Sequence, residues 1–268
     1  MMKEKRIVSN RGRIFYWTEK AAAGMESLVF LPGLTADHRL FDLQVPYFAK
    51  CYHVLVWDAP AHGKSRPYLD FSYSHLAEEL KAILDAEGIR RAVLVGQSAG
   101  GFVAQSFIAR YPSMVRGLFT IGTCPYGAGY YSSSDLFWLK QTKWMFKCFP
   151  NSLLRSSIAK MCSVTPAGRE NMLQMLGSYE KEELCSLMYL GFAGFIPEIQ
   201  DLKIPCPVCL TVGDQDRTGK VRAYNERWHE KGGYPLHIIK AASHNANYDQ
   251  PDVMNLLLEE FIQNLSTQ

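Results

Sequence analysis

The feature that most constrains the fold of this chain is a serine between an apolar strand pattern and a helical pattern. Residues 92–95 read Ala-Val-Leu-Val, an unbroken apolar run that predicts a strand buried on both faces of a parallel sheet. Ser98 follows in a Gly-x-Ser-x-Gly motif, and a helix-period pattern runs on from residue 102 to 110. Gly96 and Gly100 leave room at a tight strand-to-helix turn, which would expose the hydroxyl at a helix N-terminus. The stretch therefore predicts a nucleophile elbow, against the alternative of a glycine-flanked serine in an ordinary loop.

Strand and helix patterns alternate along most of the chain. A β-hairpin is expected over residues 6–18, and buried strands over 27–31, 53–57, 92–95, 115–122, 207–212 and 236–239. Helical patterns fall near 38–49 and over 74–87, 102–110, 218–231 and 251–265. This alternation is typical of βαβ units, so we predict an α/β fold with a mostly parallel central sheet and flanking helices.

The alternation stops near Thr123. Residues 124–200 carry only helix-like patterns, rich in Trp, Phe, Met and Tyr, before a strand pattern returns. We therefore expect a core domain formed by residues 1–123 and 201–268, with residues 124–200 inserted as a helical cap.

The composition of the chain indicates which binding partners and which cellular compartment to expect. The 268 residues have a net charge of +3 and no run of Lys or Arg, which gives no argument for nucleic acid or an anionic membrane. No segment has the length of a transmembrane span, and the N-terminal residues lack the apolar core of a signal peptide. The seven cysteines are an odd, scattered set, unlike a disulfide framework. We expect a cytoplasmic protein; nothing in the sequence specifies its oligomeric state.

A serine nucleophile needs a base and an acid that orients the base, and the loops after parallel strands are where such groups converge. Asp214 and Asp216 follow the strand that ends at Val212, and His244 follows the last strand. The other histidines lie in predicted strands and helices or precede the serine, so His244 is the candidate base. Asp216 is favoured over Asp214 as its partner because it lies further along the turn. The order serine, acid, histidine is that of one class of hydrolase.

The candidate oxyanion hole uses two backbone N–H groups. One belongs to Ala99, the residue after the serine, and the other to Leu34, in the loop after the first parallel strand. Gly33 in that loop allows the backbone to approach closely.

These motifs together resemble the α/β-hydrolase fold superfamily. The segments that carry the resemblance are Leu31-Pro32-Gly33-Leu34, Asp58-Ala59-Pro60-Ala61-His62-Gly63, Gly96-Gln97-Ser98-Ala99-Gly100, Gly213-Asp214-Gln215-Asp216 and Ser243-His244. The resemblance implies a nucleophile at Ser98, an acid at Asp216 and a base at His244, with no metal and no organic cofactor. Three departures from the family pattern occur: Pro32 stands where many members have histidine, Ala61 stands where glycine is usual, and the proline often found a few residues after the acid is absent from residues 217–220.

The nucleophile and the cap suggest the substrate class. Relatives with dehalogenase or epoxide hydrolase activity place aspartate at the nucleophile, so Ser98 favours acyl transfer instead. The expected substrate is a small to medium apolar carboxylic ester; alternatives are amidase, lactonase, carbon–carbon bond hydrolase or perhydrolase activity, or a receptor-like ligand-binding protein with little turnover. Candidate pocket residues, which could equally pack the cap on the core, are Trp138, Trp144, Met145, Met188 and Phe192.

Overall fold

The computed structural model describes residues 2–20 and 26–265 and is built on an eight-stranded sheet. The strands, in chain order, are β1 (Lys3–Val8), β2 (Arg13–Glu19), β3 (Ser27–Leu31), β4 (His53–Trp57), β5 (Ala92–Gln97), β6 (Val115–Ile121), β7 (Val208–Gly213) and β8 (Leu236–Ile239). Their spatial order is β1-β2-β4-β3-β5-β6-β7-β8. The hairpin β1–β2 joins the edge of β4 antiparallel, and all other pairings are parallel. The predicted α/β fold with a mostly parallel sheet is confirmed.

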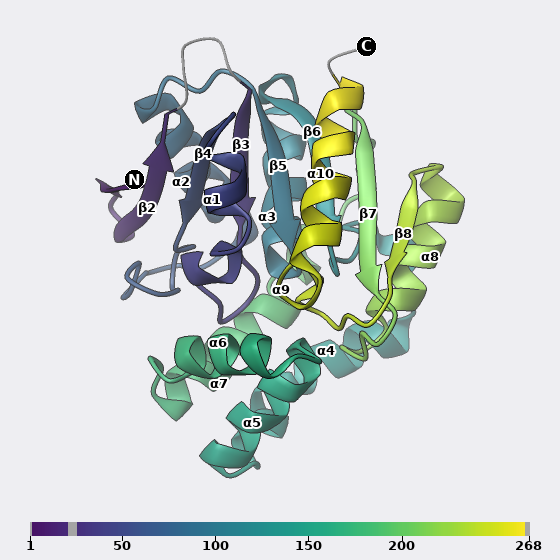
Figure 1. Cartoon of the computed structure of the whole chain (residues 1–268). Helices are drawn as coiled ribbons and strands as arrows, with labels where there is room; N and C mark the ends of the chain where they lie inside the picture. The colour runs from purple at the N-terminus through teal and green to yellow at the C-terminus, as the bar shows by residue number, and fades with distance from the viewer. Residues whose placement is uncertain (1, 21–25, 266–268) are drawn as a thin grey trace.

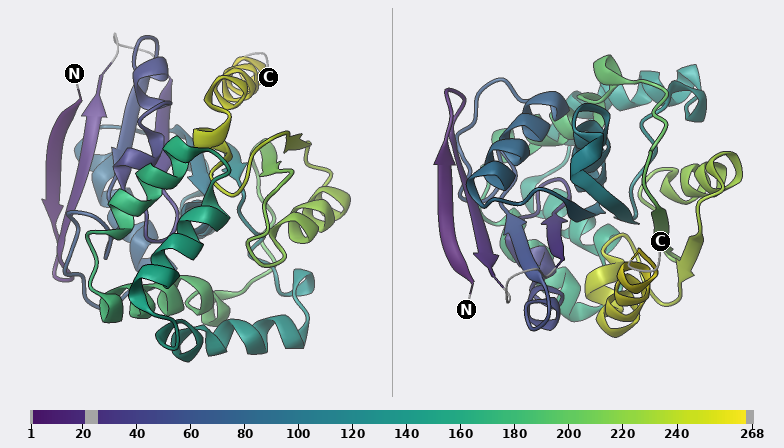
Figure 2. Two further views of the ribbon diagram at one scale, coloured as in Figure 1. Left: turned by 60° about the horizontal axis from the view of Figure 1, so that its bottom comes forward. Right: turned by 90° about the horizontal axis from the view of Figure 1, so that it is seen from above.

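Helices cover both faces of the sheet (Figures 1 and 2). One face carries α2 (Tyr73–Ala86), α3 (Ala99–Arg110) and α8 (Val221–Gly232), and the other carries α1 (Val45–Phe48) and α10 (Pro251–Leu265). Successive residues of β3 supply the two cores in turn: Phe30 packs on the α10 side, whereas Val29 and Leu31 pack on the α3 side. All residues of β3, β5 and β7 are buried, as a sheet covered on both faces requires.

In the described residues, four α-helices lie between β6 and β7 and cover the end of the sheet at which the parallel strands finish (Figure 1). They are α4 (Ser133–Lys147), α5 (Asn151–Cys162), α6 (Pro166–Leu176) and α7 (Lys181–Ala193), and the described residues between Ile121 and Val208 contain no strand. Ser132 begins α4 in a capping box with Asp135, and Thr165 caps α6. Across the residues that the structure describes, no helix is long and apolar enough to cross a membrane.

One expected helix is divided. In place of a single helix over 38–49, the structure has a 3₁₀ turn at His38–Phe41 and then the short α1. Asp37 caps the first piece by accepting a hydrogen bond from the Arg39 N–H, and Pro46 lies in the first turn of the second piece. Proline has no N–H to extend a preceding helix, so it starts a new one.

Candidate active site

Ser98 lies at a strained turn between β5 and α3. Its φ of 49° and ψ of −119° are unusual for a residue with a side chain, and its N–H donates to the Ile121 carbonyl at 2.9 Å. The flanking glycines are sterically required, because a Cβ on Gly100 would lie 1.9 Å from the Leu31 carbonyl oxygen and one on Gly96 would lie 2.6 Å from the Gly101 Cα. Strain held in place by such close packing is typical of functional positions.

Asp216 and His244 meet at the ends of β7 and β8. The His244 Nδ1 lies 2.8 Å from the Asp216 Oδ2, and both side chains are buried. Burial acts to raise the pKa of the Asp216 carboxyl, but the charge of His244 and hydrogen bonds from His244 and Thr218 outweigh it, so this pKa lies below its usual value. Asp216 is thus held as a carboxylate, and the engaged Nδ1 leaves Nε2 as the free nitrogen of the ring. Asp214 instead accepts from the Ala242 N–H at 3.3 Å.

The structure brings Ser98 and His244 to the walls of the same two cavities, but no hydrogen bond joins the two side chains. Gly122, at the end of β6, is packed against the histidine and its acid: a Cβ there would lie 3.0 Å from the His244 Nδ1 and 3.2 Å from the Asp216 Oδ2. Its φ of +55° also favours glycine. The sequence offered no sign of this requirement.

The loop after β3 lies directly over the elbow. A Cβ on Gly33 would lie 3.0 Å from the Ser98 Cβ and 2.0 Å from the Gln97 Oε1. Within the described residues, the N–H groups of Leu34 and Ala99 have no protein acceptor. Neither N–H group is engaged by a described residue, so each remains able to donate a hydrogen bond to a bound anion.

Two cavities of unequal size meet at Ser98. The larger is about 600 Å³, and its walls include Ala99, Phe102, Leu139 and Tyr131. The smaller is about 70 Å³, and its walls include Ala36, Ile158 and Met172. Both are lined mainly by apolar side chains, as ligand cavities usually are.

Four of the five candidate pocket residues line these cavities. Trp138, Met145 and Phe192 line the larger one, and Met188 lines the smaller one, to which Phe192 also contributes. Contrary to the expectation from the sequence, Trp144 lines neither cavity. Its side chain is 56% exposed, and its Nε1 donates to the Gln141 side chain on the same helix. Trp144 lies six positions after Trp138, which turns it away from the cavity on a helix of 3.6 residues per turn.

Gln97 links the elbow to the histidine loop. It is buried, and its Nε2 donates to the His244 carbonyl at 3.1 Å and to the Asn245 Oδ1 at 3.2 Å. The sequence signal for Gln97 is a polar residue at the end of an apolar strand.

Asp249 fastens the histidine loop to the segment between α5 and α6. Its Oδ2 accepts from the N–H groups of Ser243 at 2.9 Å and Val164 at 3.1 Å. Its Oδ1 accepts from the Thr165 N–H at 3.1 Å, and from the hydroxyls of Thr165 and Ser163. The Asn245 N–H also donates to the Cys162 carbonyl at 2.7 Å. The inserted helices are therefore tied to the residues on both sides of His244.

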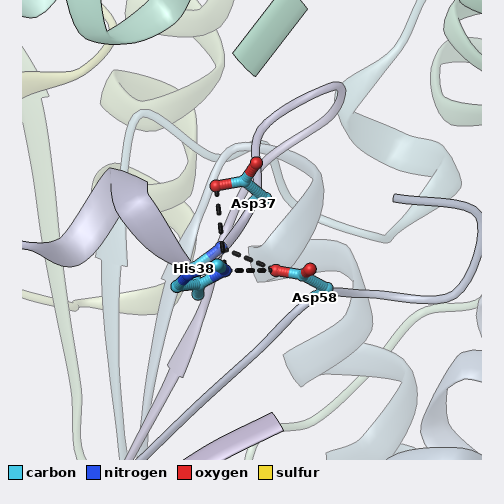
Figure 3. Close-up of side chains that lie close together, drawn as sticks. All are labelled: Asp37, His38 and Asp58. Atoms are coloured by element: carbon cyan, nitrogen blue, oxygen red, sulfur yellow. Dashed lines mark hydrogen bonds and ion pairs between the residues drawn. The ribbon is translucent and has the colours of Figure 1, made fainter. Parts of the chain in front are cut away.

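A cluster of Asp37, His38 and Asp58 has side chains close enough to suggest a cation site (Figure 3). Its carboxylates are already engaged. Asp58 accepts from the backbone and Nδ1 of His38 and from the Lys64 N–H, while Asp37 accepts from the Arg39 guanidinium at 2.6 Å. The Arg39 N–H also donates to Asp37, so the two carboxylates together accept hydrogen bonds from four N–H groups and one guanidinium. These bonds hold the turns after β3 and β4 in place and leave no free oxygen ligands of the kind that a hard cation needs.

A family model, the alpha/beta hydrolase fold, matches residues 26–161 of this chain. Among curated proteins, the chain is 25% identical over 170 residues to "Ethanol acetyltransferase 1" of Cyberlindnera jadinii, covering 54% of this chain and 51% of that protein. It is 23% identical over 229 residues to 2-hydroxy-6-oxo-6-phenylhexa-2,4-dienoate hydrolase of Comamonas testosteroni, covering 81% of this chain and 79% of that protein. The chain spans about half or less of the length of three curated relatives, the Cyberlindnera protein among them.

A solved structure gives the same fold over nearly the whole chain. A thermophilic esterase from Thermogutta terrifontis superposes with a TM-score of 0.77 at 19% identity, covering 98% of this chain and 99% of that one. At this identity the likeness concerns the fold alone.

Proposed function

The chain belongs to the α/β-hydrolase fold family, and we propose that it is a cofactor-free serine hydrolase that cleaves small to medium apolar carboxylic esters. The observation that carries the proposal is the 2.8 Å contact between His244 Nδ1 and Asp216 Oδ2, made beside Ser98 at the wall of an apolar cavity.

In the proposed mechanism, the Ser98 Oγ attacks the ester carbonyl while the His244 Nε2 takes its proton. Asp216 holds the ring in the tautomer that leaves Nε2 free, and stabilises the imidazolium as it forms. The N–H groups of Leu34 and Ala99 stabilise the negative charge on the carbonyl oxygen. His244 then protonates the departing alkoxide, and water activated by the same histidine hydrolyses the acyl-enzyme.

The proposed division of the chain follows from where the inserted helices lie. We take residues 1–123 and 201–268 as the core that carries the triad, and 124–200 as a cap. Support comes from the cavity walls, because Leu139, Phe146 and Phe192 of the inserted helices line the larger cavity together with Ser98. Closing a site in this way excludes water and strengthens its electrostatic interactions.

An ester fits this cavity better than an anionic substrate. Among the described residues that line the larger cavity, Lys220 is the single cation, and its Nζ is already paired with the Asp135 carboxylate at 2.6 Å. A substrate carboxylate would therefore compete with an existing ion pair. Cleavage of a carbon–carbon bond is the second candidate activity. It is supported by the match to the Comamonas testosteroni hydrolase, which covers 81% of this chain.

Turnover of p-nitrophenyl esters tests the proposal. We expect hydrolysis of short and medium acyl chains, and a fall of at least about 10³ in kcat for Ser98→Ala. Ser113→Ala is the matched control, because Ser113 is exposed. Full activity in folded Ser98→Ala would contradict the proposal. A second panel of vinylogous diketones, amides and lactones separates the alternatives: preferential cleavage of the diketones would replace the ester assignment with carbon–carbon bond hydrolysis.

A further inference from the structure

Helix α4 directs its largest apolar side chains outward. Phe137, Trp138 and Trp144 are 56%, 55% and 56% exposed, and Met145 is 36% exposed. Phe137 and Trp144 are seven residues apart, as are Trp138 and Met145, so each pair lies two turns apart in nearly the same direction. The four side chains fall within an arc of about 120°, with Trp138 and Met145 at the edge next to the cavity. We call these four residues the α4 apolar face. Soluble proteins rarely expose clustered large apolar side chains without an interaction to make there.

The apolar surface continues to the entrance of the larger cavity. Trp138 and Met145 are exposed and also line that cavity, as does Met161 at the end of α5, which is 41% exposed. Beyond α4, Phe149 and Leu153 are 45% and 49% exposed. The entrance to Ser98 is therefore bordered by the same side chains that form the exposed apolar surface.

The charged residues in this part of the chain are all basic. Residues 136–169 include six basic residues and no Asp or Glu; the basic residues are Lys140, Lys143, Lys147, Arg155, Lys160 and Arg169. Lys140 and Lys160 are exposed, and within the described part of the chain neither is held in an ion pair, whereas Lys147 pairs with Glu182 at 3.4 Å. The whole-chain charge of +3, which gave no argument for a membrane, conceals this local excess.

We propose that the α4 apolar face docks on an anionic lipid surface, with Lys140 and Lys160 facing the lipid headgroups and the cavity entrance turned toward the lipid. Exposed Trp and Phe beside lysines are the composition of helices that lie in a lipid–water interface. A second copy of the chain fits this surface less well, because pairing two such faces would bring like charges together. Apolar substrates would then reach Ser98 without crossing bulk water.

Co-sedimentation with vesicles tests the docking surface without any turnover, so its result is independent of the proposed function. The wild-type chain is expected to bind vesicles of phosphatidylcholine with phosphatidylglycerol, and to bind pure phosphatidylcholine at least about tenfold more weakly. Phe137→Ser with Trp144→Ser should lower the partition coefficient at least about tenfold, because it removes two large apolar side chains that line neither cavity. Lys140→Glu should lower it at least about fivefold.

Matched controls lie elsewhere on the molecule. Leu256 is 62% exposed on α10, and Lys50 is exposed after α1; Leu256→Ser and Lys50→Glu should bind vesicles as the wild type does. Intrinsic fluorescence provides a second readout, since transfer of Trp138 and Trp144 into the interface should shift the emission to the blue.

Three results would overturn the proposal. The first is failure of the wild type to bind anionic vesicles, and the second is equal binding to zwitterionic vesicles. The third is a dimer in solution that Phe137→Ser with Trp144→Ser dissociates, which would assign the face to a second copy of the chain.

Discussion

Replacing Asp249 with asparagine should loosen the contact between the histidine loop and the inserted helices. In Asp249→Asn, the new NH₂ group must face N–H donors that the carboxylate now accepts, at Ser243 and Val164 or at Thr165. Each orphaned buried donor costs about 1–3 kcal/mol, and the remaining bonds lose the strength that a charged acceptor gives them. We expect a loss of about 2–4 kcal/mol in the free energy of unfolding, or about 4–16 °C in Tm for a chain of this size.

Calorimetry and urea unfolding measure the loss, and Asp252→Asn is the matched control. Asp252 is exposed in the first turn of α10 and should change the free energy by about 0.5 kcal/mol at most. Because Ser243 precedes His244, Asp249→Asn should also lower kcat more than it changes KM. An Asp249→Asn protein as stable as the Asp252→Asn protein would refute the reasoning.

Three further predictions concern the backbone, the acid and a buried thiol. Ala61→Gly should stabilise the fold by about 0.5–1 kcal/mol in urea unfolding, because Ala61 has a φ of 68° and relief of that strain exceeds the entropy that glycine adds to the unfolded chain. The pKa of Asp216 is lower in the folded protein than in the unfolded chain, so its contribution to stability is complete above about pH 5 and is lost as the pH falls through the folded pKa. Asp216→Asn should therefore flatten the acid limb of a stability–pH curve, and it should reduce kcat by about 10⁴. Burial raises the pKa of the Cys162 thiol to about 12, so iodoacetamide at neutral pH should alkylate exposed Cys148 first in peptide mass maps, and equal rates would contradict this.

The sheet and the elbow could be predicted from the sequence because their patterns are local. An apolar run such as 92–95 can be buried in few ways, and Gly96 and Gly100 mark a turn that only small residues permit. The choice between Asp214 and Asp216 rested on position along a turn, and the structure places Asp216 against His244.

What the sequence did not reveal depends on tertiary placement. Trp144 is a large apolar residue of the kind expected in a ligand pocket, but its side chain is exposed. Packing against the rest of the fold decides which side of α4 faces the cavity, and helical periodicity alone does not specify that side. Asp249 has no motif at all: its five donors come from two segments about 80 residues apart in the chain, and only folding brings them to one carboxylate. Gly122 is required by the pair beside it, which lies more than 90 residues further along the chain.

Intact-mass and peptide analysis after treatment with a fluorophosphonate tests the central claim most directly. The account predicts one phosphonyl group per chain, carried on the peptide that contains Ser98, with no adduct in folded Ser98→Ala. Absence of an adduct on the folded wild-type chain, or an adduct on a different residue, would contradict the assignment of Ser98 as an activated nucleophile.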